Sequence, residues 1–81
     1  MDTFDLRDTI KNHLIELRTS RGITQTDVGN IVGKSKTAVA SWEQGLSLPD
    51  AVTLYHLAQY YGKTMDFFYS SNHDSDDSSL L

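Results

Sequence analysis

The chain has 81 residues, a formal net charge of -4 and no cysteine. A chain of this length forms one domain with a small core, which argues against a large active-site cavity. The lack of cysteine excludes disulfides and cysteine-based zinc sites, and the apolar runs are too short to span a membrane. The composition therefore predicts a soluble, cytoplasmic protein with no metal, no cofactor and no membrane partner.

The charge is distributed unevenly, which matters because proteins that bind nucleic acid usually carry a basic surface. Three acids, Asp74, Asp76 and Asp77, lie in the last eight residues. The segment 18–41 instead has a local balance of +3, because it holds one acid, Asp27, and four cations: Arg18, Arg21, Lys34 and Lys36. This patch is modest, so we expect few phosphate contacts and further affinity from base readout or a dimer.

Two helices are expected in the first part of the chain. Apolar residues at helical spacing follow Asp5, which can cap the first helix, and Gly22 ends that helix. The second helix, at about residues 25–32, follows Thr24. The Thr24 hydroxyl and the Asp27 carboxylate can each accept a hydrogen bond from an unpaired amide of the first turn, as in a capping box.

The third helix is expected at about residues 36–43, with Ser35 as its cap and Gly33 in the turn before it. Glycine supplies the positive φ that a sharp turn between helices needs. The turn is too short for the second and third helices to lie antiparallel, so one of them must project from the fold. The third is the better candidate because its predicted inward line is narrow and consists of Ala38, Val39 and Trp42.

A fourth helix is expected to begin after Asp50 and to end at Gly62, and a short fifth helix after Thr64 is expected to cover the open end of the core. No segment alternates as strands do, so the predicted fold is all-α, with one domain at residues 1–69. Residues 70–81 are rich in Ser and Asp and too polar to bury. We interpret them as a disordered acidic tail or the start of a linker.

The outward face of the third helix carries side chains suited to reading DNA, namely Lys34, Ser35, Lys36, Thr37 and Ser41. A lysine can donate to O6 and N7 of guanine, and a hydroxyl can bond to either base type. By contrast, the three histidines lie on separate segments without metal-ligand spacing, and no nucleophile is paired with a base. The residues therefore predict a binding surface and not an enzyme or a metal site.

Three segments carry a spacing that is more specific together than any one of them alone. They read Leu17-Arg18-x-x-Arg21-Gly22-Ile23-Thr24-Gln25, Val28-Gly29-x-x-x-Gly33 and Val39-x-x-Trp42-Glu43-x-Gly45. This pattern resembles the Cro/repressor-type (Xre-type) helix-turn-helix transcription regulators, a family that includes phage repressors. The resemblance covers roughly residues 6–69 and implies a compact five-helix, lambda-repressor-like domain.

The resemblance implies DNA contacts at particular positions. Gln25 matches a residue that commonly holds a phosphate or braces the first base-reading side chain. Residues 45–47 match a loop whose backbone amides often grip the sugar-phosphate backbone. Positions that commonly reach base edges or flanking phosphates are occupied by Ser35, Lys36, Thr37 and Ser41.

The resemblance also implies structural roles, and the chain departs from the pattern at two positions. Arg18 and Glu43 match a pair that typically forms a partly buried salt bridge between the first and third helices. Gly29 stands where many relatives have alanine, which suggests close packing against the third helix. Lys34 replaces the usual small apolar residue of the turn, where it can add a phosphate contact.

We therefore expect a sequence-specific double-stranded DNA-binding transcriptional repressor. Its third helix (about 35–43) would enter the major groove, and a homodimer would bind a palindromic operator. The alternative is an antitoxin-like or regulatory protein-interaction module whose DNA binding is secondary. Six aromatic residues between positions 55 and 69 are expected to be mostly core, and their excess suits a dimer face or protein partner. The predicted tail fits either a true C-terminus or the start of a linker to an oligomerisation domain that this chain lacks.

Overall fold

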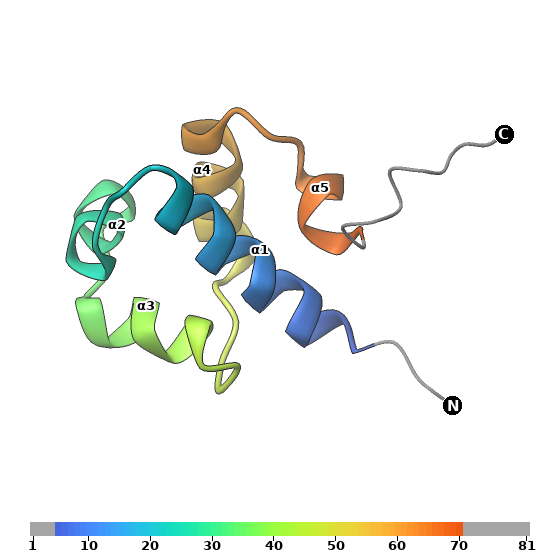
Figure 1. Cartoon of the computed structure of the whole chain (residues 1–81), viewed down its shortest axis with the longest axis horizontal. Coiled ribbons are helices and arrows are strands. Elements are labelled where there is room, and N and C mark those ends of the chain that lie inside the picture. Colours follow the sequence, from blue (N-terminus) through green and yellow to red (C-terminus); the bar gives the residue numbers. More distant parts are fainter. Residues whose placement is uncertain (1–4, 71–81) are drawn as a thin grey trace, which may run out of the picture.

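The computed structural model describes residues 5–70, which fold into five α-helices and contain no strand (Figure 1). In chain order the helices are α1 (Leu6–Ser20), α2 (Gln25–Val32), α3 (Lys36–Glu43), α4 (Ala51–Tyr61) and α5 (Met65–Tyr69). This arrangement confirms the predicted all-α, five-helix fold. The tail predicted at residues 70–81 lies outside the described residues except for Ser70.

Each helix begins at a side chain that accepts a hydrogen bond from a backbone N–H of the first turn. Such caps are needed because the first amides of a helix have no partner within it. The predicted capping box of α2 is present, since Thr24 N–H donates to Asp27 Oδ2 over 2.9 Å and Asp27 N–H donates to Thr24 Oγ1 over 3.0 Å. The five caps are Asp5, Thr24, Ser35, Asp50 and Thr64.

The core is centred on α1, which contacts α3 on one side and α5 on the other (Figure 1). Its buried apolar residues are Ile10, Leu14, Leu17, Val28, Val39, Trp42, Leu54, Leu57, Ala58, Tyr61 and Phe68. Phe68 of α5 is 0% exposed, so α5 does close the end of the core, as expected. The aromatic group between 55 and 69 is less buried than predicted, because Tyr55, Tyr60 and Tyr69 are exposed.

His13 joins α1 to the end of α5. Its side chain is 2% exposed, and its ring lies 4.4 Å from the Phe67 ring, measured between centroids. The His13 Nε2–H donates to the backbone oxygen of Ser70 over 2.6 Å. Ser70, the first residue of the predicted tail, is thus held against α1.

The turn between α2 and α3 packs closely on α2 at Gly29. Gly33 has φ 72°, and the N–H of Lys34 closes the turn by donating to the oxygen of Gly29 over 2.8 Å. A Cβ atom at position 29 would clash with the backbone oxygen of Lys34. The close contact predicted for Gly29 is therefore made to the turn that leads into α3.

None of the helices within residues 5–70 has the length and the apolar character needed to cross a membrane. The same residues contain no group of three or more His, Asp or Glu side chains that is arranged to hold a metal ion.

Candidate nucleic-acid interface

Helix α3 lies at the edge of the molecule, beside α2 and α1 (Figure 1). Its inner side is fixed by Val39, which is 1% exposed, and Trp42, which is 6% exposed. Residues 34–37, which include the turn, the cap and the first two helical residues, are all exposed. The helix therefore presents its N-terminal polar groups away from the core.

The side chains of Lys36 and Thr37 make no hydrogen bond or ion pair with other residues in the range 5–70. Both are exposed, and no carboxylate within residues 5–70 lies at ion-pair distance from the Lys36 ammonium. Ser35 is also exposed, but its Oγ accepts the N–H of Ala38 over 3.1 Å as the cap of α3. Its hydroxyl proton is still available for a second hydrogen bond.

Ser41 lies near the end of α3 and is tied to the loop that follows. Its Oγ is 2.7 Å from the Oγ of Ser47, so one hydroxyl donates to the other and the second proton is left for another acceptor. The loop returns to the helix because Leu46 N–H donates to the backbone oxygen of Ser41 over 3.0 Å. The sequence spacing did not indicate this serine pair, since it depends on how the loop folds back.

The backbone amides of this loop are less available than the family resemblance implied. Gly45 N–H donates to Trp42 oxygen over 3.2 Å, and Leu46 N–H is used as just described. Both donors are therefore already engaged within the protein. The Ser47 N–H has no acceptor among the described residues, so this amide and the exposed Ser47 hydroxyl are the groups that the loop offers beside α3.

Lys34 is exposed but is paired with an acid. Its Nζ lies 3.7 Å from Oδ2 of Asp50, the cap of α4. The Thr53 backbone N–H lowers the pKa of Asp50, and Lys34 adds a smaller lowering, so the carboxylate is ionised at neutral pH. The ion pair reduces the positive charge that Lys34 can offer to a phosphate.

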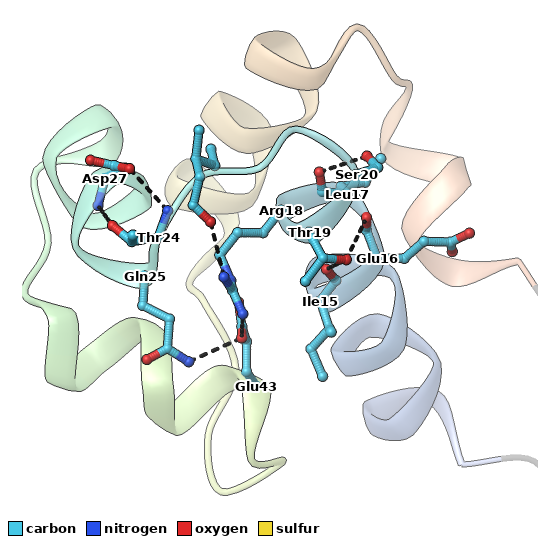
Figure 2. A network of polar contacts seen from close by, with 11 residues as sticks. Ile15, Glu16, Leu17, Arg18, Thr19, Ser20, Thr24, Gln25, Asp27 and Glu43 are labelled. Carbon is cyan, nitrogen blue, oxygen red and sulfur yellow. Dashed lines mark hydrogen bonds and ion pairs between the residues drawn. The ribbon is translucent and has the colours of Figure 1, made fainter.

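Gln25 belongs to a polar network that connects α1, α2 and α3 (Figure 2). Its Nε2 donates to Glu43 Oε1 over 3.0 Å. Arg18 binds the same carboxylate with two hydrogen bonds, from Nε to Oε2 over 2.8 Å and from Nη2 to Oε1 over 3.0 Å. The hydrogen bond to Glu43 raises the pKa of Arg18, and the Glu43 side chain is only 7% exposed.

Arg18 makes a third hydrogen bond, from Nη1 to the backbone oxygen of Ile23 over 2.9 Å. Ile23 precedes the cap of α2, so the guanidinium also fixes the point where the chain enters α2. Figure 2 shows Gln25 extending from the start of α2 toward the end of α3, where Glu43 lies. The sequence indicated the Arg18–Glu43 pair through the resemblance, but it did not indicate that Gln25 shares the carboxylate.

The local charge of +3 is not gathered on one face. Arg18 is bound to Glu43, and Lys34 is bound to Asp50. Arg21 turns toward α4, where its guanidinium lies 5.5 Å from the Tyr60 ring and 5.3 Å from the Tyr61 ring. Of the four cations in this segment, only Lys36 is left without a carboxylate or aromatic partner among the described residues.

Comparison with known proteins identifies this arrangement. The helix-turn-helix family model matches residues 14–68, which is more than half of the chain. An uncharacterized HTH-type transcriptional regulator of Sinorhizobium fredii, y4dJ, is 36% identical over 58 residues, which cover 72% of this chain and 75% of that protein. The crystal structure of the P22 c2 repressor protein with synthetic operator 9T, in the presence of Tl+, has a TM-score of 0.72 at 22% identity. This match covers 78% of this chain and 96% of the repressor chain.

The chain therefore belongs to the Cro/repressor-type (Xre-type) helix-turn-helix family, as its motif spacing predicted. The match to the P22 c2 repressor confirms the five-helix, repressor-like fold. Membership of this family makes the protein a DNA-binding transcriptional regulator and not an enzyme.

Proposed function

We propose that the protein is a sequence-specific, double-stranded DNA-binding repressor whose α3 enters the major groove. The observation that carries this proposal is the exposed run 34–37 on a helix that Val39 and Trp42 hold from the inner side. Lysine and hydroxyl groups in this position can contact base edges. The description of the S. fredii relative as a transcriptional regulator, and the operator bound to the P22 c2 repressor, support the same function.

Within this proposal, each predicted residue has a role that follows from its surroundings. Lys36, Thr37 and Ser41 read bases, and Ser35 reaches a base or a flanking phosphate while it caps α3. Lys34 and Gln25 contact the sugar-phosphate backbone. Such contacts fix the position of the protein on the duplex and do not distinguish base sequences. Arg18 and Glu43 serve as the structural pair behind this surface.

A second copy of the chain is part of the proposal. One copy offers few cations to phosphates, so affinity for an operator requires two copies, which read half-sites about 34 Å apart on a palindrome. Three exposed apolar residues follow α3 and supply a surface for this contact, namely Leu46, Leu48 and Val52, which are 69%, 44% and 66% exposed. A dimer bound to an operator that overlaps a promoter would repress by excluding the polymerase.

Selection of bound sequences from random duplex DNA tests the proposal directly. We expect enrichment of a palindromic sequence whose half-sites are spaced by about one helical turn. Lack of any enrichment at moderate salt would remove sequence-specific binding from the account. Enrichment of a single half-site would retain base reading by α3 but exclude the dimer.

Lys36→Ala measures the base-reading role of α3. We expect binding to the enriched duplex to weaken by about 1 to 3 kcal/mol, with a smaller loss on random DNA, because a lysine that contacts a base contributes to specificity. Lys63→Ala is the matched control, since Lys63 lies between α4 and α5, with its Nζ 4.8 Å from the Phe67 ring centroid. An equal loss on both duplexes would assign Lys36 to the phosphates.

The three exposed tyrosines favour one further candidate function, a regulatory module with a protein partner. Tyr55, Tyr60 and Tyr69 are 50%, 41% and 40% exposed, and tyrosine is enriched in protein interfaces. This candidate predicts a stoichiometric partner that protects Tyr60 and Tyr69 from chemical labelling. It would replace the repressor proposal if such a partner were found and the selection enriched no operator.

A further inference from the structure

The carboxylate of Glu43 accepts hydrogen bonds from two other helices, α1 and α2. Its two oxygens accept two hydrogen bonds from Arg18 on α1 and one from Gln25, the first residue of α2. The Glu43 side chain is 7% exposed, so these donors provide most of its solvation. Glu43 is therefore a fixed acceptor to which the start of α2 is attached.

This acceptor determines how the Gln25 amide is oriented. An ionised carboxylate can only accept hydrogen bonds, so Gln25 must direct its NH2 group, and not its oxygen, toward Glu43. One N–H of that group is used over 3.0 Å, and the other N–H is left for a partner outside the protein. Without Glu43, the amide would be free to turn over and to present its oxygen instead.

The first turn of α2, to which Gln25 belongs, also holds backbone N–H groups. The capping box uses the backbone N–H groups of Thr24 and Asp27. The first amides of a helix have no acceptor within it, so the N–H groups of Gln25 and Thr26 are also available at the start of α2. These free backbone donors, together with the helix dipole, make the start of α2 suited to a phosphate oxygen.

We infer that Glu43 is a positioning residue for DNA binding, which acts by orienting the Gln25 amide toward a phosphate of the DNA backbone. This inference rests on the proposed function, because it takes the DNA backbone to lie at the start of α2. Arg18 also contributes to phosphate binding at this position. By pairing with Glu43 through two hydrogen bonds, Arg18 neutralises a carboxylate that would otherwise repel the phosphate.

The positioning role can be separated from a structural role. Gln25 is half-buried, and its removal leaves both hydrogen bonds between Arg18 and Glu43 in place. Gln25→Ala also keeps the backbone N–H groups of α2. We therefore expect this substitution to lower the unfolding temperature by only a few degrees, as for loss of one hydrogen bond, while it weakens DNA binding at temperatures where the protein stays folded.

The orientation of the amide can be observed without DNA. In the parent protein, we expect one side-chain N–H resonance of Gln25 to be shifted downfield and to exchange slowly with solvent. Glu43→Gln removes the negative acceptor, so this resonance should move toward the position of a solvated amide. Gln59 is the control, since its Nε2 donates to the Tyr55 hydroxyl over 2.8 Å on α4 and should not respond. A Gln25 amide that is already solvent-like in the parent protein would overturn the inference.

A double-mutant cycle measures the consequence for DNA. On a random duplex about two helical turns long, we expect Gln25→Ala to weaken binding about tenfold, as for loss of 1.4 kcal/mol. Glu43→Gln should weaken it by less, because the Arg18 charge that it leaves unpaired attracts phosphates, and the double variant should bind no more weakly than Gln25→Ala alone. Gln59→Ala should bind within about twofold of the parent, as expected for a surface change away from the interface.

The outcomes distinguish this inference from the proposed function. Losses that add in the double variant would assign Glu43 and Gln25 separate effects and would overturn the positioning role. If Glu43→Gln does not fold, the affinity and unfolding temperature of Gln25→Ala decide, because an unchanged affinity is incompatible with the inference. Selection of an operator together with unaffected Gln25→Ala binding would leave sequence-specific reading by α3 standing and would remove the Gln25 phosphate contact together with this step.

Discussion

The two halves of the molecule are held together by different means. Helices α1, α4 and α5 supply most of the core, including Leu14, Leu57 and the fully buried Phe68. Helices α2 and α3 together contribute only Val28, Val39 and Trp42 to it. The scaffold thus depends on buried apolar surface, whereas the helix-turn-helix unit depends more on caps, a close backbone contact and the Glu43 network.

This difference has a consequence for the exposed surface of α3. A helix that buries only one narrow line can leave its other side chains for a ligand, but its orientation must then be set by specific polar contacts. Apolar burial is tolerant of small shifts, whereas hydrogen bonds require defined distances and angles. Substitutions in the network and the turn should therefore affect the helix-turn-helix unit more than their exposure suggests.

The largest effect is expected from breaking the pair at the centre of the network. Arg18→Met leaves the Glu43 carboxylate, which is 7% exposed, without its charged partner. Removal of one member of such a pair costs about 2 to 4 kcal/mol, somewhat below a fully buried pair because Arg18 is 19% exposed. Urea denaturation followed by circular dichroism measures this loss.

Two further variants show whether the loss comes from the stranded charge. Arg18→Met combined with Glu43→Leu removes both charges and should recover part of the stability, since no uncompensated carboxylate is left. Arg7→Met, at an exposed position of α1, is the matched control and should change the free energy of unfolding by less than about 0.5 kcal/mol. A double variant less stable than Arg18→Met would show that the pair contributes net stability beyond charge compensation.

The turn provides the next test. Gly29→Ala increases helix propensity by about 1 kcal/mol, yet its Cβ atom would meet the backbone oxygen of Lys34. A turn backbone cannot move aside as a flexible side chain does, so we expect a net destabilisation of about 1 to 3 kcal/mol. Thr26→Ala, at an exposed position of the same helix, should be nearly neutral. A stabilised Gly29→Ala protein would mean that the turn shifts easily.

Much of the fold was predictable because the helix boundaries depend on residues that are close together in the sequence. The cap residues and Gly33 indicated where helices start and turn, and each of these signals acts within a few residues. The inward line of α3 followed from helical spacing, with Val39 and Trp42 as its most buried members. Local rules of this kind do not require knowledge of the packed structure.

The partners of the candidate site residues were less predictable. Ser41 with Ser47, Lys34 with Asp50, and Gln25 with Glu43 each join residues from different elements. Their distances are set by how the helices pack and how the loop returns, and spacing along the chain does not contain this information. For the same reason, a count of cations in one segment overstated the charge that α3 displays.

Lys34 tests how far a cation counted in the sequence contributes to the positive charge at the surface of the helix-turn-helix unit. We expect Lys34→Ala to weaken enriched and random duplexes alike, as a phosphate contact should, and to reduce the salt slope by less than the roughly one unit of a full contact. The reason is that Asp50, 3.7 Å away, already neutralises part of this charge. Fluorescence anisotropy at several salt concentrations gives the slope.

Asp50→Asn is the complementary variant for the Lys34 prediction. Asparagine can still cap α4, but the negative charge beside Lys34 is removed. We expect tighter binding to random DNA and a steeper salt slope, since Lys34 then offers its full charge. An unchanged slope in both variants would place Lys34 outside the interface.

The smallest effect on the free energy of unfolding is expected from lowering the pH. It acts on the carboxylates at the starts of α2 and α4 and not on the apolar core. The backbone N–H of Thr24 lowers the pKa of Asp27, and that of Thr53 lowers the pKa of Asp50. Because the folded pKa is below the unfolded value of about 3.9, the caps stabilise fully above that value and lose their contribution as pH falls through the folded pKa. Stability measured from pH 7 to pH 2 should thus decline mainly below about pH 4. Asp27→Asn with Asp50→Asn removes both charges and should flatten this decline. An unchanged decline would assign it to other carboxylates.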